Sequence, residues 1–148
     1  MTDEIQELQR SFDMNVKAID EAYSRAAKRC HLSPSSFDIL YTLFAYGDSC
    51  TQKELCERCY DGKQTVNSAV HKMQRDGLLR ISAGAGRSTH VHLTDTGRAY
   101  ASRAIVPVLD AERTAIESLG SDEREFLSRV MGTYTRRLVH ALDGIESI

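Results

Sequence analysis

The chain has 148 residues, a formal net charge of −2, 41% apolar residues and 27% charged residues. This length suits one domain, and this composition excludes the disordered class. No apolar run approaches the roughly 20 residues that a membrane-spanning helix needs, and the acidic, polar first residues are unlike a secretory signal. We therefore expect a folded, cytoplasmic protein that does not enter a membrane.

Two helices are predicted at the start of the chain. Residues 3–30 repeat apolar side chains every three or four positions, as one face of a long helix does. These side chains are Ile5, Leu8, Phe12, Val16, Ile19, Tyr23, Ala26 and Cys30. A capping residue before a proline, Ser33-Pro34, begins a second helix, which ends at Gly47. Its apolar stripe consists of Phe37, Leu40, Tyr41 and Phe44.

Two further helices are predicted in the middle of the chain. Thr51 and Glu54 have the spacing of a capping box and begin a short helix. A second helix covers residues 62–77, and Asp76-Gly77 ends it. Its apolar face consists of Val66, Ala69, Val70 and Met73. Its opposite face carries small hydrogen-bonding side chains and cations: Lys63, Gln64, Thr65, Asn67, Ser68, His71, Lys72 and Arg75.

A β-hairpin is predicted over residues 78–94, with a glycine-bearing tip and Arg87 near that tip. The polar face of the preceding helix suits the DNA major groove. Helix, turn, helix and hairpin in this order form the layout of a winged helix-turn-helix. The pattern therefore predicts a DNA-binding regulator.

The charge distribution supports this prediction. Residues 51–103 hold nine Lys or Arg against five Asp or Glu, whereas the rest of the chain holds ten against sixteen. A basic middle between acidic flanks concentrates positive potential where phosphates would bind, although a solvated surface can produce the same asymmetry.

Two helices are predicted at the end of the chain. One runs from a Thr94 cap to Leu119, and Pro107 inside it should remove one hydrogen bond and kink it. The last helix begins after Gly120-Ser121, with the stripe Phe126, Leu127, Val130, Tyr134, Leu138 and Leu142. The first and last helices are amphipathic but are not needed for the recognition unit. We expect them to form a homodimer interface, with a monomeric six-helix domain as the alternative.

The cysteines and histidines admit more than one interpretation. Cys56 and Cys59 form a C-x-x-C inside the predicted helix, without the two further ligands of a zinc site. We interpret the four cysteines as packing residues, with redox sensing or metal binding as the alternative. His90 and His92 alternate on one strand face, which we expect to be solvated or to face DNA.

Catalytic signatures are absent from the sequence. It has no G-x-S-x-G, no phosphate-cradling glycine loop and no H-E-x-x-H. His71 projects from the predicted recognition helix, where a DNA contact is favoured over a role as a base. We therefore expect a protein that is not an enzyme and that needs no cofactor.

Several motifs, in this order and spacing, resemble the MarR family of bacterial transcription regulators. The resemblance rests on ELCERC, GKQTVNSAVHKMQRDGLL, IVPVLDAER and VHLTDTGRAY, the last containing the family's LT-x-x-G as Leu93, Thr94 and Gly97. It implies one mostly α domain over residues 1–148 with a small β-hairpin wing, in the α+β class. Residues 33–99 would form the winged helix-turn-helix lobe, and residues 3–30 and 100–145 the dimerisation helices.

The resemblance also assigns a role to the wing. Family wings often carry Asp-x-Arg near the tip, where the Asp braces the wing and the Arg enters the minor groove. Arg87 matches the Arg, but Ala85 replaces the Asp, so the bracing salt bridge is absent from the sequence. An Arg in a narrow minor groove selects A·T-rich shape. The expected DNA contacts are Lys63, Gln64, Thr65, Asn67, Ser68, His71, Lys72, Arg75 and Arg87.

Three functional hypotheses follow. The first is a dimeric regulator, a repressor of a pseudo-palindromic operator, that responds to a small ligand. The resemblance implies that such ligands, often phenolic anions, bind between the dimerisation helices and the DNA-binding lobe. The side chains expected to border that cleft are Tyr23, Phe37, Tyr41 and Tyr100, each of which would also suit a core. The second hypothesis is a cysteine-based sensor of metal or oxidant, and the third is a winged helix used for protein contacts.

Overall fold

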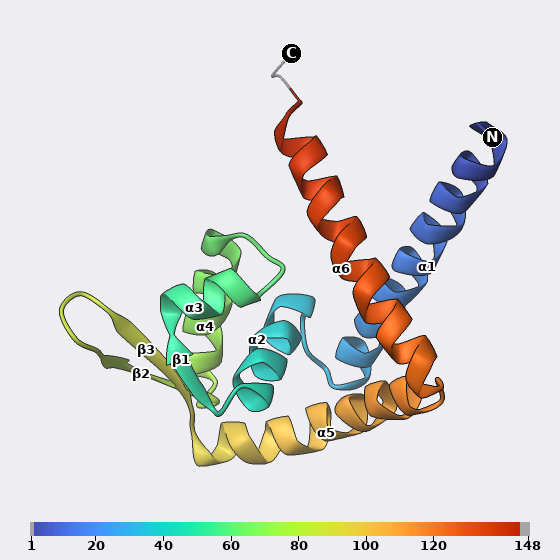
Figure 1. Ribbon diagram of the computed structural model, residues 1–148. Helices are drawn as coiled ribbons and strands as arrows, with labels where there is room; N and C mark the ends of the chain where they lie inside the picture. The colour runs from blue at the N-terminus through green and yellow to red at the C-terminus, as the bar shows by residue number, and fades with distance from the viewer. Residues whose placement is uncertain (1, 146–148) are drawn as a thin grey trace. The chain divides into compact units, whose positions relative to one another are not determined.

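The computed structural model describes residues 2–145 (Figure 1). Within this range the chain forms six helices and one three-stranded antiparallel sheet, which confirms the predicted mostly helical fold with a small wing. The chain divides between Val108 and Leu109 into two compact units. The division lies inside helix α5 (Asp95–Glu117), next to Pro107.

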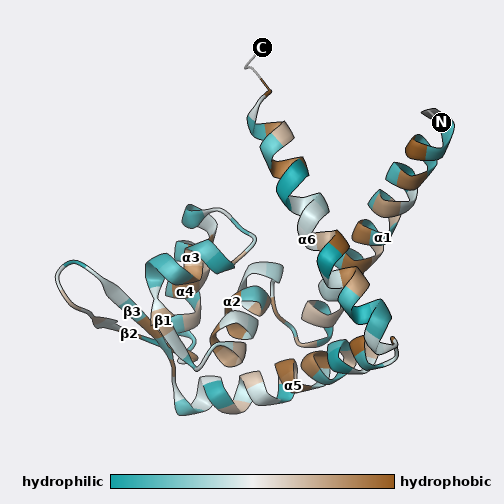
Figure 2. Ribbon diagram, viewed as in Figure 1, coloured by the Kyte–Doolittle hydropathy of each residue, from teal (hydrophilic) through white to brown (hydrophobic). Residues whose placement is uncertain are grey.

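The first two helices are α1 (Thr2–Arg29) and α2 (Pro34–Ala45). Ser33 caps α2 as predicted, because its hydroxyl accepts the N–H of Ser36 at 3.2 Å. Helix α1 keeps many apolar side chains exposed, and Figure 2 shows them recurring along its length. The predicted α1 is therefore confirmed, and most of its apolar face has no cover within the single chain.

Helix α2 is buried over more of its surface than the predicted stripe. Ile39 and Leu43 are fully buried, whereas Tyr41 and Phe44 from the stripe are only half-buried. The reason is that α2 contacts α1, α4 and the sheet, so neighbours surround it on several sides. An amphipathic stripe underestimates the core in such a central helix.

Helix α3 (Gln52–Arg58) begins with the predicted capping box. The Thr51 N–H donates to Glu54 Oε2 at 2.8 Å, and the Glu54 N–H donates to Thr51 Oγ1 at 3.1 Å. The expectation that Cys59 lies inside this helix is wrong. Cys59 has extended backbone angles and caps the helix, because the next amide, of Tyr60, donates to the Asp38 side chain instead of continuing the helix.

Helix α4 (Lys63–Arg75) buries Val66, Val70 and Met73 and leaves Ala69 half-buried. Gly77 follows it with a φ of +76°, a backbone conformation that glycine adopts without the steric cost of a side chain. The predicted apolar face and the predicted stop signal are therefore both confirmed.

The sheet has the order β1-β3-β2, from β1 (Ser49–Thr51), β2 (Leu79–Ala83) and β3 (Thr89–Leu93). Val91 of β3 pairs with Cys50 on one side and with Ile81 on the other. The hairpin was predicted and β1 was not, because three residues are too few to show an alternating pattern. Strand β1 ties the base of the wing to the start of α3.

Two long helices complete the described chain. Thr94 caps α5 as predicted, since its hydroxyl accepts the Gly97 N–H at 2.9 Å. Helix α6 (Ser121–Asp143) begins with Asp122 and Glu123, and the Glu123 carboxylate accepts the Gly120 N–H at 2.7 Å. None of the described residues of α6 is buried. The kink at Pro107 stays a prediction. No helix in residues 2–145 combines the length and apolar character required to cross a membrane.

Candidate nucleic-acid interface and ligand cavity

The outward face of α4 is the main candidate surface for DNA. Seven of its eight predicted contacts are exposed: Lys63, Gln64, Thr65, Ser68, His71, Lys72 and Arg75. Lys72 forms an ion pair with Asp76 at 2.7 Å on this surface, with both side chains largely exposed. Such an exposed pair is weak, so the Lys72 ammonium remains able to exchange its partner for a phosphate.

Asn67 differs from the other predicted contacts. It is half-buried, and its Oδ1 accepts the side-chain N–H of Gln52 at 2.7 Å and the thiol of Cys56 at 3.8 Å. A bidentate contact to adenine needs both the oxygen and the nitrogen of the amide. Asn67 therefore braces α4 against α3 here, and it must release Gln52 before it can read a base in that way.

The wing presents Arg87 as an exposed side chain at its tip. Where the family pattern has a bracing Asp, the tip is held by Ser88, whose hydroxyl donates to the Ala85 carbonyl at 2.8 Å. The Gly84 N–H also donates to the Ser88 carbonyl at 2.8 Å, and Gly86 has a φ of +65°. A tight turn with a hydroxyl contact thus replaces the missing salt bridge.

The polar face of the hairpin carries groups that the sequence only partly singled out. His90 and His92 are stacked with ring centroids 6.0 Å apart, and Arg80 pairs with His92 in the strand register. Burial, with smaller contributions from Arg80 and His90, lowers the pKa of His92, and Ser82 lies 2.8 Å from its Nε2. Among the described residues, no group of three or more His, Cys, Asp or Glu side chains is placed to hold a metal ion.

All four cysteines are free thiols. Cys50 and Cys59 are buried, and Cys59 Sγ lies 3.8 Å from the Thr42 hydroxyl. Burial raises the pKa of Cys50, and burial together with the nearby Asp38 carboxylate raises the pKa of Cys59 to about 12. Because the thiolate is the reactive form, Cys59 is suited to packing rather than to sensing.

Cys59 should therefore react slowly with alkylating reagents in the folded protein. At pH 8 a thiol of pKa about 12 has a thiolate fraction about a thousandfold below that of an ordinary cysteine. We expect iodoacetamide to modify Cys59 at least about a hundredfold more slowly in the folded chain than in urea. Peptide mass spectrometry at timed intervals measures both rates. Equal rates in the two states would show that Cys59 is reactive.

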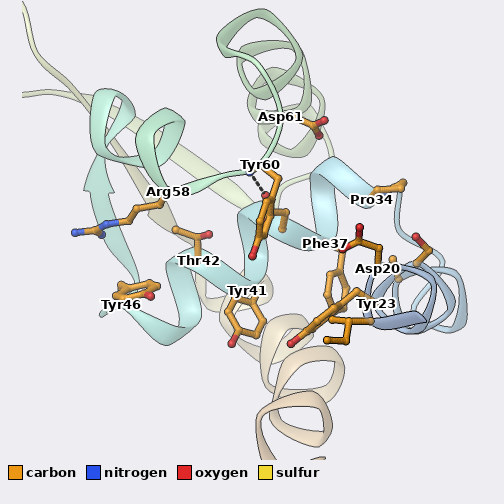
Figure 3. Close-up of a pocket in the computed structure, with 14 residues that line it drawn as sticks. Asp20, Tyr23, Pro34, Phe37, Tyr41, Thr42, Tyr46, Arg58, Tyr60 and Asp61 are labelled. Carbon is orange, nitrogen blue, oxygen red and sulfur yellow. Dashed lines mark hydrogen bonds between the residues drawn. The ribbon is translucent and has the colours of Figure 1, made fainter. Parts of the chain in front are cut away.

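A cavity of about 630 Å³ lies between α1, α2 and the turn that joins α3 to α4 (Figure 3). Three of the four predicted effector residues, Tyr23, Phe37 and Tyr41, line it. Tyr100 does not, because its hydroxyl donates to the Cys30 carbonyl and so joins α5 to the end of α1. The sequence reasoning missed eight lining residues that carry polar or aromatic groups: Asp20, Ser24, Asp38, Thr42, Tyr46, Arg58, Tyr60 and Asp61.

Two hydrogen bonds connect the wall of this cavity to the turn before α4. The Tyr60 N–H donates to Asp38 Oδ2 at 2.8 Å, and the Ser35 hydroxyl donates to the Asp61 carboxylate. Burial raises the pKa of Asp38, and the Tyr60 N–H partly offsets this effect. Helix α2, which forms one wall of the cavity, therefore holds the segment from which the candidate recognition helix starts.

Comparison with known sequences supports a winged helix-turn-helix in this part of the chain. A MarR family model matches residues 32–88, which include α2, α3, α4, β2 and the tip of the hairpin. The iron-dependent repressor IdeR of Mycobacterium tuberculosis is 32% identical over 81 residues, which make up 55% of this chain and 34% of that protein. IdeR of Mycobacterium leprae matches to the same extent. The chain thus spans about a third of the length of the curated relatives it matches.

Solved structures show the same fold. A MarR family regulator from Neisseria meningitidis is similar with a TM-score of 0.78, 22% identity and coverage of 90% of this chain and 95% of that one. MepR of Staphylococcus aureus in complex with DNA has a TM-score of 0.69 and 17% identity, with coverage of 87% and 96%. An organohalide-sensing regulator bound to 2,4-dichlorophenol has a TM-score of 0.65 and 21% identity, with coverage of 90% and 80%.

Proposed function

We propose that this chain is a transcription regulator of the MarR family, and that it acts as a homodimeric repressor which a small molecule releases from its operator. The observation that carries this proposal is the exposed polar and cationic face of α4 together with an exposed Arg87 at the wing tip. A helix for the major groove and an Arg for the minor groove are the two parts of winged-helix recognition. Such a regulator would act in the bacterial cytoplasm.

The proposed dimer rests on apolar residues that the single chain leaves uncovered. In α1 these include Ile5, Leu8 and Ile19, each more than half exposed, and α6 exposes Phe126 and Leu142 to a similar degree. Uncovered apolar surface of this extent marks an interface. We expect light scattering to give a mass near twice 16.6 kDa at micromolar concentration. A monomer under these conditions would contradict the proposal.

The operator proposal is tested by selecting bound sequences from random duplex DNA. Two recognition helices related by a twofold axis should enrich inverted half-sites about one helical turn, roughly 10 base pairs, apart. A pool that remains random after selection at moderate salt would show that binding is only electrostatic.

Ligand control is proposed from the two hydrogen bonds between the cavity wall and the turn before α4. A ligand that binds better when Tyr60 or Asp61 has moved would shift the chain toward an arrangement in which α4 starts from a different position. The dichlorophenol complex of a protein with this fold supports ligand binding as the input.

A metal-responsive regulator is the second candidate, because the chain is similar to an iron-dependent repressor over 81 residues. This candidate predicts that Fe²⁺ tightens operator binding and that a chelator reverses the effect. The proposed small-molecule repressor predicts the same operator affinity with the metal and with the chelator.

A further inference from the structure

The lining of the cavity is acidic. Asp20 of α1, Asp38 of α2 and Asp61 of the turn before α4 all border it, against one guanidinium, that of Arg58. Asp38 and Asp61 accept hydrogen bonds from neutral donors, the Tyr60 amide and the Ser35 hydroxyl. The ion pairs of residues 2–145 involve none of the three carboxylates. Their charges are therefore solvated or hydrogen-bonded but not neutralised.

Arg58, the single cation in the lining, lies apart from Asp20 and forms a contact with an aromatic ring. The Arg58 guanidinium stacks 4.9 Å above the ring centre of Tyr46. Figure 3 shows this pair at the opposite end of the cavity from Asp20 and Tyr23. An anion bound beside Asp20 would thus meet repulsion without a nearby positive partner.

The rest of the lining suits a cation with apolar groups. Phe37 is buried against the cavity, and Figure 3 shows the Tyr23 ring at the same end of it as Phe37 and the Tyr41 ring between this end and Tyr46. Aromatic faces attract cations, and aromatic rings together with carboxylates form the usual surroundings of bound organic ammonium groups. The volume of about 630 Å³ fits a drug-sized molecule.

We propose that the cavity binds a bulky organic cation, an aryl or alkyl ammonium or phosphonium, in preference to the phenolic anion that the family resemblance suggests. Asp20 and Asp38 supply the opposing charge, and the rings of Tyr23, Phe37 and Tyr41 cover the apolar groups. The inference rests on the proposed function in one respect, namely that binding of this cation is the signal that releases the protein from DNA. Burial raises the pKa of Asp38, and a cation bound beside it would lower that pKa again by stabilising the carboxylate.

The test uses two probes of nearly equal size and opposite charge, tetraphenylphosphonium and tetraphenylborate. Isothermal titration calorimetry measures the affinity of the full chain for each probe. We expect the phosphonium to bind at least about tenfold more tightly, because its charge is opposite to that of the lining. Asp20→Asn and Asp38→Asn should each weaken phosphonium binding about threefold to tenfold and leave borate binding unchanged or tighter. Asn at position 38 keeps an acceptor for the Tyr60 N–H, and circular dichroism checks that each variant is folded.

Asp13→Asn provides the matched control. Asp13 lies on α1 two turns before Asp20, is exposed and does not line the cavity, so its replacement should leave both affinities unchanged. Tighter binding of tetraphenylborate than of tetraphenylphosphonium by the wild type, or an equal loss of phosphonium affinity in all three variants, would overturn the inference. Selective phosphonium binding that leaves operator affinity unchanged would support the cation site and contradict only the proposed ligand control of DNA binding.

Discussion

Replacing Gly97 by alanine is expected to lower the free energy of unfolding by about 3 kcal/mol or more. Gly97 lies in the first turn of α5, where a Cβ atom would overlap the carbonyl oxygen of Leu78 and lie 2.9 Å from its carbonyl carbon. Both clashing atoms belong to the backbone, so a side-chain rotation cannot relieve the contact. The base of the wing would have to move away from α5.

The same clash affects the hydrogen bonds of the neighbouring Thr94. Its hydroxyl donates to the Gly77 carbonyl at 2.7 Å and accepts the Gly97 N–H. The Thr94 N–H also donates to the Leu78 carbonyl at 3.1 Å. Moving Leu78 away from Gly97 would thus strain the bonds that join the end of the hairpin to α5, which adds to the steric cost.

Urea unfolding followed by circular dichroism measures the effect of Gly97→Ala. Gly62→Ala is the control, because a Cβ at Gly62 would have no heavy atom within 4 Å and its φ is −64°. The control should change the free energy of unfolding by about 1 kcal/mol or less, as expected of a helix cap. Equal midpoints for the wild type and Gly97→Ala would show that the backbone is not in this close contact.

The features that the sequence predicted well are local ones. The caps at Ser33, Thr51 and Thr94 each join a side chain to a backbone N–H three residues later. Residues close together in the sequence are therefore enough to identify these caps. The apolar face of α4 was predicted for the same reason, since a helical repeat is visible in a single segment. The stop at Gly77 needed only a residue that tolerates positive φ.

The features that the sequence did not predict depend on distant partners. The Tyr100 hydroxyl donates to the carbonyl of Cys30, 70 residues away, and Tyr100 does not line the cavity that it was expected to border. Asn67 bonds to Gln52 of the neighbouring helix, 15 residues away. Strand β1 forms because β3 pairs with it, and its three residues are too few to show the alternating pattern of a strand.

The acidic lining of the cavity shows the same limit in the candidate site. Asp20, Asp38 and Asp61 come from three separate elements, and each looks like an ordinary surface acid in its own segment. Their shared location follows from the packing of α1 on α2 and from the bond between Asp38 and the Tyr60 amide. A periodic pattern cannot contain that information, because it describes one element at a time.

Replacing Arg87 or Gln64 by alanine is expected to weaken DNA binding in two different ways. Arg87 is a full charge at the exposed wing tip, so Arg87→Ala should weaken binding to all duplexes, by about tenfold at moderate salt. The slope of log affinity against log salt should fall by about 1 per lost phosphate contact, hence by about 2 for a dimer with two wings. Any change in preference should follow A·T content, since the minor groove is read by its width.

Gln64 is neutral and exposed in the first turn of α4, where base edges come within reach. Gln64→Ala should remove about 1–3 kcal/mol of discrimination at one position of each half-site and leave the salt slope unchanged. Asn67→Ala should also relax base preference. Because the Asn67 amide braces Gln52, that variant should in addition lose about 1 kcal/mol of stability, which makes Gln64 the cleaner test of base reading.

Fluorescence anisotropy with the selected operator and with scrambled duplexes, at several salt concentrations, separates the two effects. Gln74→Ala and Arg124→Ala are the matched controls. Both side chains are exposed, Gln74 near the end of α4 and Arg124 in the first turn of α6. Both controls should bind as the wild type does. If Arg87→Ala left both affinity and salt slope unchanged, the hairpin of residues 79–93 would not be a DNA-contacting wing. The specificity would then have to come from α4 alone.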